Sequence, residues 1–283
     1  VNPVEFDLNQ VLRETLRTIA PRIYERESLE FLCEVEPSIP THLVGDPVRL
    51  KQILVNLIGN SAKFTNSGDV KLKLQAKALD TEHATLCFEV SDTGIGIAPE
   101  RLASIFEPFT QADNSTVRQY QGTGLGLTIV KQLVETMGGE ITATSEVERG
   151  STFTLEVPFE RVRSASEQDP ICRLDDKIVI ILDHVPRRRD SLRQLLLQNG
   201  AAEVWETITP DLARPQQSEI VLLATGEMLM QRDNWEFVKK FRRTYGSARI
   251  VTLHTPNQLT LREELETLDV AYMLNRPTLP REI

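Results

Sequence analysis

The first residues whose types and spacing could support chemistry lie on a predicted helix that begins after Asp46-Pro47 and extends to about Phe64. An aspartate followed by proline is typical of a helix start. A polar stripe on one face of this helix consists of Gln52, Asn56, Asn60 and Lys63. Amide oxygens are hard ligands for Mg²⁺ and an ammonium group attracts phosphate oxygens, so the stripe suits a metal-bound polyphosphate. A solvated helix face explains the same pattern, and the stripe alone does not decide between the two.

Two glycine-containing segments follow the stripe. The first, Asp92-Thr-Gly94-Ile-Gly96-Ile97, comes directly after a predicted strand. Two glycines spaced by one residue would allow the backbone to approach a flat ligand closely, and the Asp92 carboxylate could accept a hydrogen bond from the adenine amino group. The second segment opens a predicted helix and favours an anion site at its start; it consists of Gly122, Thr123, Gly124, Leu125, Gly126 and Leu127.

The polar stretch 110–121 between these segments is predicted to be a mobile lid over a bound nucleotide. Arg118 within it could reach a phosphate. Other readings of the glycine segments are weaker. The Asp92-Thr-Gly94 tripeptide also occurs in aspartic proteases, which need a second Asp-Thr-Gly. The most similar tripeptide in this chain, Ala224-Thr-Gly226, lacks the aspartate. The second segment has the wrong glycine spacing for a Rossmann fingerprint, and no P-loop motif is present.

Taken in order, four motifs resemble the boxes of sensor histidine kinases. Asn56-Leu-Ile-Gly-Asn60-Ser-Ala-Lys63-Phe64-Thr65 resembles the N box, and Asp92–Ile97 resembles the G1 box. Phe106-Glu-Pro-Phe109 and Gly122–Leu127 resemble the F and G2 boxes. The resemblance covers about residues 1–160. It implies the Bergerat-type ATP-binding fold, which is shared with type II topoisomerases, Hsp90-like chaperones and mismatch-repair ATPases.

The resemblance also implies residue roles. Asn60 would coordinate Mg²⁺, Lys63 would contact phosphate, Phe64 would lie near the base, and Asp92 would bind the adenine amino group. Gly94, Gly96, Ile97, Phe109, Arg118 and the residues 122–127 complete the predicted ATP-binding set. Hydrolytic relatives carry a glutamate four residues before the metal-binding asparagine, where this chain has Asn56. An amide cannot take a proton from water, so we expect ATP to be held for an outside nucleophile.

In the family, that nucleophile is a histidine on a separate helical domain. The chain contains His42, His83, His184 and His254, and none of them lies in the sequence context that the family uses. We therefore expect this chain to be the catalytic ATP-binding half of a longer kinase whose phosphoaccepting dimerisation domain is absent here. A non-catalytic nucleotide-sensing module and a topoisomerase-like ATPase remain alternatives, and Asn56 disfavours the second.

Residues 1–160 are predicted to be an α+β Bergerat-type sandwich in which helices pack on one face of a mixed, mostly antiparallel sheet. Predicted helices follow Asp7 (8–23) and Asp46, and a third covers 125–137. The predicted strands are 70–74 and 86–90, with a hairpin of 141–145 and 152–157. A polar, aperiodic linker is expected over 161–176.

In residues 177–283, predicted strands alternate with predicted helices. Apolar strands at 178–182, 220–224, 249–253 and 270–274, with a weaker one near Val204-Trp205, are separated by helical stretches at 187–198, 234–245 and 259–268. This alternation predicts a small doubly wound parallel α/β domain. Behind a kinase domain it resembles a response-regulator receiver, which would make the parent a hybrid sensor kinase. A generic α/β domain of other origin is the alternative.

The receiver-like segment lacks residues that receivers need for phosphorylation. Asp183 is followed by His184 where the family has an acidic pair, and Ala224 stands where the phosphoaccepting aspartate is expected. His254 follows the fourth strand, and Arg276 takes the position of the lysine. A methyl group cannot be phosphorylated and one acid is a poor Mg²⁺ site, so we expect a degenerate receiver with a regulatory role.

Composition restricts the setting and the partners. A net charge of −9 argues against a nucleic-acid-coating role, and no apolar run approaches the roughly 20 residues of a membrane span. Three widely spaced cysteines form neither a disulfide framework nor a Cys-x-x-Cys metal site, which favours the cytoplasm. We expect the cytoplasmic portion of a membrane-anchored sensor, a homodimeric parent, and downstream receiver or phosphotransfer proteins as partners.

Overall fold

The computed structural model describes residues 2–25, 28–108, 125–162, 174, 177–207, 220–229, 232–246, 248–255, 270 and 272–275. The chain divides into two compact units, Val1–Glu167 and Gln168–Ile283. Several predicted features lie outside the described residues: the lid 110–121, the helix 259–268, most of the linker, and the site residues Phe109, Arg118, Gly122, Thr123, Gly124 and Arg276.

The first unit is built on a seven-stranded sheet of order β1-β3-β7-β5-β4-β2, with β6 paired to β7. Its strands are β1 (Val4–Asp7), β2 (Leu29–Val35), β3 (His42–Gly45), β4 (Gly68–Leu79), β5 (His83–Asp92), β6 (Glu140–Glu146) and β7 (Gly150–Arg161). Only the β2–β4 pairing is parallel within this path, so the predicted mixed, mostly antiparallel sheet is confirmed. The strands β1, β2 and β3 have no counterpart among the predicted elements.

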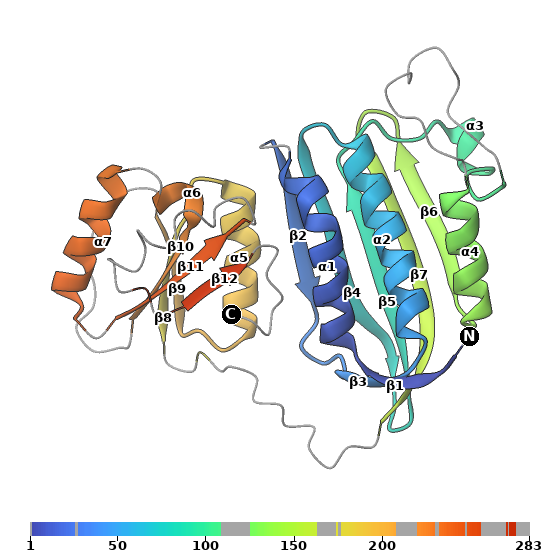
Figure 1. Ribbon diagram of the computed structural model, residues 1–283, viewed down its shortest axis with the longest axis horizontal. Helices are drawn as coiled ribbons and strands as arrows, with labels where there is room; N and C mark the ends of the chain where they lie inside the picture. Colours follow the sequence, from blue (N-terminus) through green and yellow to red (C-terminus); the bar gives the residue numbers. More distant parts are fainter. Residues whose placement is uncertain are drawn as a thin grey trace. The chain divides into compact units, whose positions relative to one another are not determined.

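Helices α1 (Leu8–Tyr24), α2 (Pro47–Phe64) and α4 (Gly126–Thr136) lie on the same face of this sheet, as Figure 1 shows, while α3 (Pro99–Leu102) is a single turn near β6. Aspartate caps start the first two helices: Asp7 accepts from the Asn9 amide and Asp46 accepts from the Arg49 amide. Helix α2 packs on α1 on one side and on α4 on the other. Its apolar stripe is fully buried and consists of Leu50, Ile53, Leu54, Leu57 and Ile58.

The second unit is a five-stranded parallel sheet of order β12-β11-β10-β8-β9. Its strands are β8 (Ile178–Leu182), β9 (Glu203–Thr207), β10 (Ile220–Thr225), β11 (Arg249–His254) and β12 (Tyr272–Asn275). The described helices are α5 (Pro186–Gln198), α6 (Gly226–Leu229) and α7 (Arg232–Thr244). Numbered within the unit, the strand order is 2-1-3-4-5, the order of flavodoxin-like doubly wound sheets.

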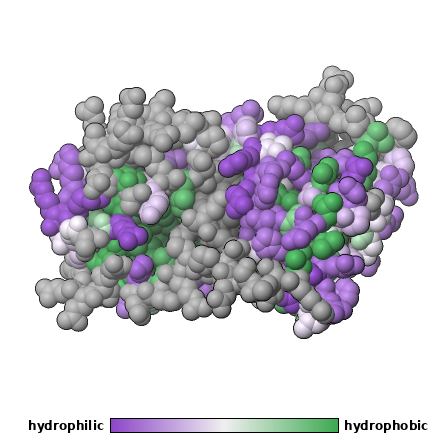
Figure 2. Space-filling view, turned by 60° about the horizontal axis from the view of Figure 1, so that its bottom comes forward, coloured by the Kyte–Doolittle hydropathy of each residue, from purple (hydrophilic) through white to green (hydrophobic). Residues whose placement is uncertain are grey.

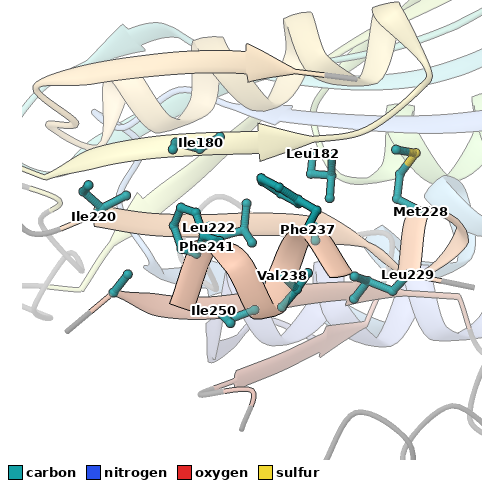
Figure 3. Packing of buried hydrophobic residues seen from close by; sticks show 12 residues of the cluster. Ile180, Leu182, Ile220, Leu222, Met228, Leu229, Phe237, Val238, Phe241 and Ile250 are labelled. Atoms are coloured by element: carbon teal, nitrogen blue, oxygen red, sulfur yellow. The ribbon is translucent and has the colours of Figure 1, made fainter. Parts of the chain in front are cut away.

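Alternate residues of the central strands pack on opposite faces of this second sheet. Even-numbered residues such as Ile180, Leu182 and Leu222 meet Met228 of α6 and Phe237 of α7, as Figure 3 shows. The intervening residues, among them Val179 and Ile181, pack instead with Leu192 and Leu196 of α5. Strand β8 is therefore buried on both faces, which explains why it reads as a continuous apolar run rather than an alternating one.

Among the described residues, none of the helices is long and apolar enough to cross a membrane. The face in Figure 2 shows hydrophobic residues lying among hydrophilic ones in the described parts of the chain. Large exposed apolar side chains, such as Val48 and Tyr272, come from separate elements of both units. Exposed apolar residues of this kind are normal for a folded protein surface.

Candidate nucleotide site

Asp92 is held on the core side of β5 by the two-residue period of the strand. Ala84, Leu86, Phe88 and Val90 are all buried, and Asp92 continues the same series at only 9% exposure. Its Oδ1 accepts hydrogen bonds from the amides of Gly94 (2.9 Å) and Ser151 (3.3 Å). Both of these backbone donors reach Oδ1, and neither of them occupies Oδ2.

The surroundings of Asp92 change its acidity. Burial raises the pKa of the carboxyl above its ordinary value, and the Gly94 amide, the Ser61 hydroxyl and the Ser151 amide only partly oppose the rise. Asp80, at the exposed turn between β4 and β5, shows the opposite behaviour. Two amides bond its Oδ1 in a similar way and hold its pKa below the ordinary value, because little burial opposes them. Asp92 is thus a desolvated carboxyl that lacks a cationic partner among the causes of its shift.

The two glycines after Asp92 make room for the protein's own backbone. A Cβ at Gly94 would lie 2.4 Å from the carbonyl oxygen of Phe64, at the end of α2. Gly96 has a φ of +69°, and a Cβ there would lie 2.1 Å from the carbonyl oxygen of Glu146, at the end of β6. In the structure both glycines allow the loop to pack closely between the end of α2 and the β6–β7 turn, and their predicted role in close approach of a ligand stays a prediction.

Replacing Gly94 by alanine should therefore disturb the loop, because the new Cβ would crowd the Phe64 carbonyl oxygen and would also lie 2.9 Å from Asp92 Oδ1. We expect the free energy of unfolding of the first unit to fall by about 1–3 kcal/mol, because the Phe64 carbonyl cannot yield without moving helix α2. Calorimetric unfolding of the full chain measures this. The control is Gly246→Ala, where a Cβ meets no described atom within 4 Å and the change should stay within about 0.5 kcal/mol. Equal stabilities of the two variants would contradict the prediction.

The β6–β7 hairpin supports the loop from the other side. The amide of Ile97 donates to Ser145 Oγ at 2.8 Å, and Ser145 Oγ also contacts the Gly150 carbonyl oxygen (2.8 Å) and Ser151 Oγ (3.0 Å). Gly150 has a φ of +112°, and a Cβ there would collide with the Asp92 carbonyl oxygen at 1.8 Å. Ser145 and Ser151 were not among the predicted site residues. Their role depends on the β5–β7 and β6–β7 registers, which no local pattern reveals.

The asparagines of α2 face the start of α4. A Cβ placed on Gly126 would lie 3.8 Å from Asn60 Nδ2 and 3.9 Å from Asn56 Oδ1, so both carboxamides reach the first residue of α4. That helix has Leu125 at its N-cap, no side-chain cap and no acidic residue in its first turn. As far as the described residues go, its first amides and its dipole can therefore attract an anion beside the carboxamides. Leu125 and Leu127, the other described members of this predicted segment, are half-buried.

Lys63 and Phe64 close α2 next to the Asp92 loop. Lys63 Nζ lies 5.1 Å from the centre of the Phe64 ring, a cation–π distance. The Phe64 carbonyl oxygen accepts from the Ile95 amide at 3.3 Å, which ties the end of α2 to the loop. Helix α2 thus places both asparagines beside α4 and Lys63 beside the Asp92 loop. Helix α2 meets Gly94 and Ile95 through the Phe64 carbonyl and Gly126 through Asn56 and Asn60, whereas Gly96 and Ile97 meet Glu146 and Ser145 of β6.

The predicted magnesium role depends on which donor groups lie near Asn60. Within the described ranges, no group of three or more histidine, cysteine, aspartate or glutamate side chains could hold a metal ion. The carboxamides of Asn56 and Asn60 are neutral oxygen donors next to an anion-attracting helix start. Mg²⁺ often takes only one or two protein ligands and obtains the rest from substrate phosphates and water. The residues present fit a Mg²⁺ ion that is bound together with a polyphosphate.

The predicted receiver positions of the second unit lie at the carboxyl ends of its strands. Asp183 follows β8 and is completely buried, whereas His184 is exposed. Ala224 is buried within β10, aligned with Leu182 of β8. His254 ends β11 and its Nε2 lies 2.6 Å from Thr252 Oγ1. These positions hold a single acid whose charge is met by an arginine, Arg188 Nε at 3.2 Å from Asp183 Oδ2.

Comparison with known proteins gives an independent view of the first unit. Residues 45–161 match the family model described as "Histidine kinase-, DNA gyrase B-, and HSP90-like ATPase". The chain is 38% identical to the sensor protein GacS of Pseudomonas syringae pv. syringae over 197 residues, 70% of this chain and 22% of GacS. It is 46% identical to the autoinducer 2 sensor kinase/phosphatase LuxQ of Vibrio vulnificus over 158 residues, 55% of this chain and 18% of LuxQ. The chain therefore spans about a fifth of the length of these curated relatives.

Among solved structures, the full-length protein ShkA in complex with AMPPNP superposes with a TM-score of 0.73 at 28% identity. The match covers 100% of this chain and 56% of that protein. AMPPNP is a non-hydrolysable ATP analogue, so a similar chain binds an adenine nucleotide.

Proposed function

We propose, on the match of residues 45–161 to the model of histidine kinase-, DNA gyrase B- and HSP90-like ATPases, that the first unit is the catalytic part of a hybrid sensor histidine kinase. It would bind ATP and transfer the γ-phosphoryl group to a histidine of a dimerisation domain outside this chain. The observation that supports this most is the convergence on α2: one end of the helix meets the Asp92 loop, and its asparagines meet the start of α4.

Adenine recognition is assigned to Asp92. The carboxylate is desolvated, and two backbone amides hold its Oδ1 in one orientation. Oδ2 can accept a hydrogen bond from the exocyclic amino group of adenine, which guanine lacks at the same ring position. A preoriented acceptor loses little entropy when the base binds, so this single contact can select the base strongly.

The polyphosphate is assigned to the region between α2 and the start of α4. The first amides of α4 offer donors and a favourable dipole, Asn60 offers a carboxamide oxygen to the accompanying Mg²⁺, and Lys63 offers a positive charge. Mg²⁺, when bound, neutralises charge on the phosphate oxygens. Arg118 and the residues 122–124 keep the phosphate roles that the sequence predicts for them.

Asn56 sets the kind of reaction. A carboxamide cannot accept a proton at neutral pH, so the chain lacks at this position a base that would activate water. In the proposed reaction an imidazole nitrogen attacks the γ-phosphorus, a P–N bond forms, the P–O bond to ADP breaks, and the imidazole releases its proton. The chain's own residues orient the nucleotide and stabilise the charge that moves onto ADP.

For the second unit we propose a receiver-like domain with a regulatory role that does not involve its own phosphorylation. Ala224 offers no acceptor oxygen at the expected position, and the single acid Asp183 is already paired with Arg188. On this proposal residues 1–160 are the ATP-binding domain, 161–176 the linker and 177–283 the degenerate receiver. The partners are the parent's own dimerisation domain, in a homodimer working in the cytoplasm, and downstream receiver or phosphotransfer proteins.

One labelling experiment tests both proposals. The chain is mixed with the phosphoaccepting domain of its parent protein and with ATP labelled at the γ-phosphate. We expect acid-labile phosphohistidine on that domain, no label on residues 177–283, and slow release of inorganic phosphate by the chain alone. Binding of an ATP analogue without any phosphohistidine would instead identify a non-catalytic nucleotide sensor. Rapid hydrolysis by the chain alone would favour an ATPase.

A further inference from the structure

A buried group of charged side chains lies at the carboxyl edge of the second sheet, outside the nucleotide site. Asp183 follows β8 with no exposed side-chain surface, and Arg188 of α5 has a side chain only 7% exposed. Arg188 Nε lies 3.2 Å from Asp183 Oδ2, and its Nη1 lies 2.9 Å from Oε2 of Glu227 in α6. The other carboxylate oxygen of Asp183 accepts from the Val185 amide at 2.8 Å. One guanidinium therefore serves two carboxylates.

Removing these charges from water would be unfavourable without this arrangement. An isolated buried carboxylate loses far more hydration than a single hydrogen bond restores. The planar fork of an arginine can bond two acids at once, which a lysine cannot do with the same geometry. Arg189 adds to the cluster from the next position, since its Nη1 donates to the Asp183 carbonyl oxygen at 2.9 Å and its Nε lies 3.3 Å from Glu206.

The cluster connects helices that pack on opposite faces of the sheet. Helix α5 covers one face through Leu192 and Leu196, while α6 covers the other through Met228 and Leu229. The Arg188–Glu227 pair spans the sheet edge where β8 and β10, which are parallel neighbours, both end. Strand β8 lies between β9 and β10, so the two strands that follow it in the chain are placed on opposite sides of it. Ligands of doubly wound sheets bind at such points.

We propose that Arg188 is a built-in cation that occupies the space between Asp183 and Glu227, excludes divalent metal ions from this edge, and holds α5 and α6 in one arrangement. Two carboxylates from neighbouring elements are a suitable ligand set for Mg²⁺ or Mn²⁺. With the guanidinium between them, both acids already have a cation within ion-pair distance, and a metal ion would have to displace it. This inference depends on the ion cluster alone and does not require the nucleotide site or the receiver assignment.

The full chain without nucleotide is the material for the test, because both of its tryptophans, Trp205 and Trp235, lie in the second unit. Their fluorescence therefore reports on that unit alone. Mn²⁺ binding is measured by the loss of the free-ion electron paramagnetic resonance signal. The variants are Arg188→Met, Arg188→Lys, Asp183→Asn and the double variant Asp183→Asn/Arg188→Met. Arg193→Met is the matched control, since Arg193 lies on the same helix with an exposed side chain, 3.5 Å from Glu206.

We expect Arg188→Met to bind one additional Mn²⁺ ion at least about tenfold more tightly than the wild type, because two carboxylates lose the guanidinium that they share. Mn²⁺ should also raise the thermal midpoint of that variant, followed by tryptophan fluorescence, by mass action. The wild type, Arg188→Lys, Arg193→Met and the double variant should show neither effect.

Two results would overturn the inference. One is Mn²⁺ binding by the wild type that Asp183→Asn removes, since the ion would then share the site with Arg188. The other is a folded Arg188→Met variant with the Mn²⁺ affinity of the wild type. If Arg188→Met does not fold, the comparison of the wild type with Asp183→Asn decides. Unchanged Mn²⁺ binding then supports a site closed by Arg188, and reduced binding overturns it.

Discussion

Asp92→Asn is expected to weaken AMPPNP binding about 10- to 100-fold, the loss of one hydrogen bond to a charged acceptor, while the ligand-free chain remains at least as stable as the wild type. Asparagine keeps an Oδ1 that can accept from Gly94 and Ser151, so the loop retains its support. In place of Oδ2 it presents an NH₂ group, which cannot accept from the adenine amino group.

The pH dependence of stability has a definite sign. Burial raises the pKa of Asp92 in the folded state, so the folded chain binds this proton more tightly than the unfolded chain does. The contribution of Asp92 to stability is therefore fully present below the unfolded pKa and is lost as the pH rises through the folded pKa. Asp92→Asn removes this loss of stability. The free energy of unfolding of the variant should therefore exceed that of the wild type by a growing amount as the pH rises from the unfolded to the folded pKa of Asp92.

Nucleotide affinity should show the opposite trend in the wild type. Protonated Asp92 is a poorer acceptor for the adenine amino group, so AMPPNP binding should strengthen as the pH rises through the pKa of the free chain. The variant should lose this dependence. Isothermal calorimetry at several pH values measures affinity, and scanning calorimetry measures stability. Unchanged AMPPNP affinity in Asp92→Asn would remove the assigned role of this residue.

Asp80→Asn is the matched control for Asp92→Asn. Asp80 also accepts two backbone amides on Oδ1, from Glu82 and His83 at 2.7 Å each, but it is exposed. Those hydrogen bonds lower its pKa, so its stabilising contribution is present above the unfolded pKa and is lost as the pH falls through the folded one. Asp80→Asn should leave AMPPNP binding unchanged and should show a pH dependence of stability opposite to that of Asp92→Asn.

Asn60→Ala is expected to abolish the Mg²⁺ dependence of AMPPNP binding and to lower the rate of phosphohistidine formation about 100-fold or more, as removal of a positioned charge-stabilising group does elsewhere. The carboxamide of Asn60 reaches the start of α4, where the phosphates are expected. Alanine keeps the helix but removes the oxygen that would hold the ion, so Mg²⁺ would be bound by the phosphates alone.

Gln52→Ala provides the control for Asn60→Ala. Gln52 carries the same functional group on the same polar stripe of α2, two turns earlier, where its Oε1 accepts from Arg49 at the surface. Affinity with and without Mg²⁺ is measured by calorimetry, and transfer is measured with labelled ATP and the phosphoaccepting domain. A retained Mg²⁺ dependence in Asn60→Ala, or an equal loss in Gln52→Ala, would contradict the metal role of Asn60.

Prediction from the sequence was most successful where a pattern depends on neighbouring residues alone. The apolar stripe of α2, the aspartate caps and the strands of the second unit depend on spacing within a few residues, and all of them are present in the structure. The strand β2 was missed although Leu29, Phe31 and Cys33 alternate and are buried. The single-turn helix α6 was also missed, because four residues are too few to show a helical period.

The candidate site was harder to predict from the sequence, because the residues that hydrogen-bond to it come from distant parts of the chain. Ser151 bonds Asp92 across 59 residues of sequence, and Ser145 bonds Ile97 across 48. Nothing in the neighbourhood of either serine indicates a role in nucleotide binding. The two glycines after Asp92 were recognised, but the proximity of Phe64 and Glu146, which also requires them, comes from distant parts of the chain.

By itself, the sequence determined the order of the four motifs, the asparagine at position 56 and the alanine at position 224, because residue identity and spacing are written directly in the chain. Only the tertiary structure decided that Asp92 faces the core with a raised pKa, and that Arg188 neutralises Asp183 while reaching Glu227. The reason is physical. Burial and charge pairing depend on which strands and helices become neighbours, and those neighbours come from segments that are far apart in the chain.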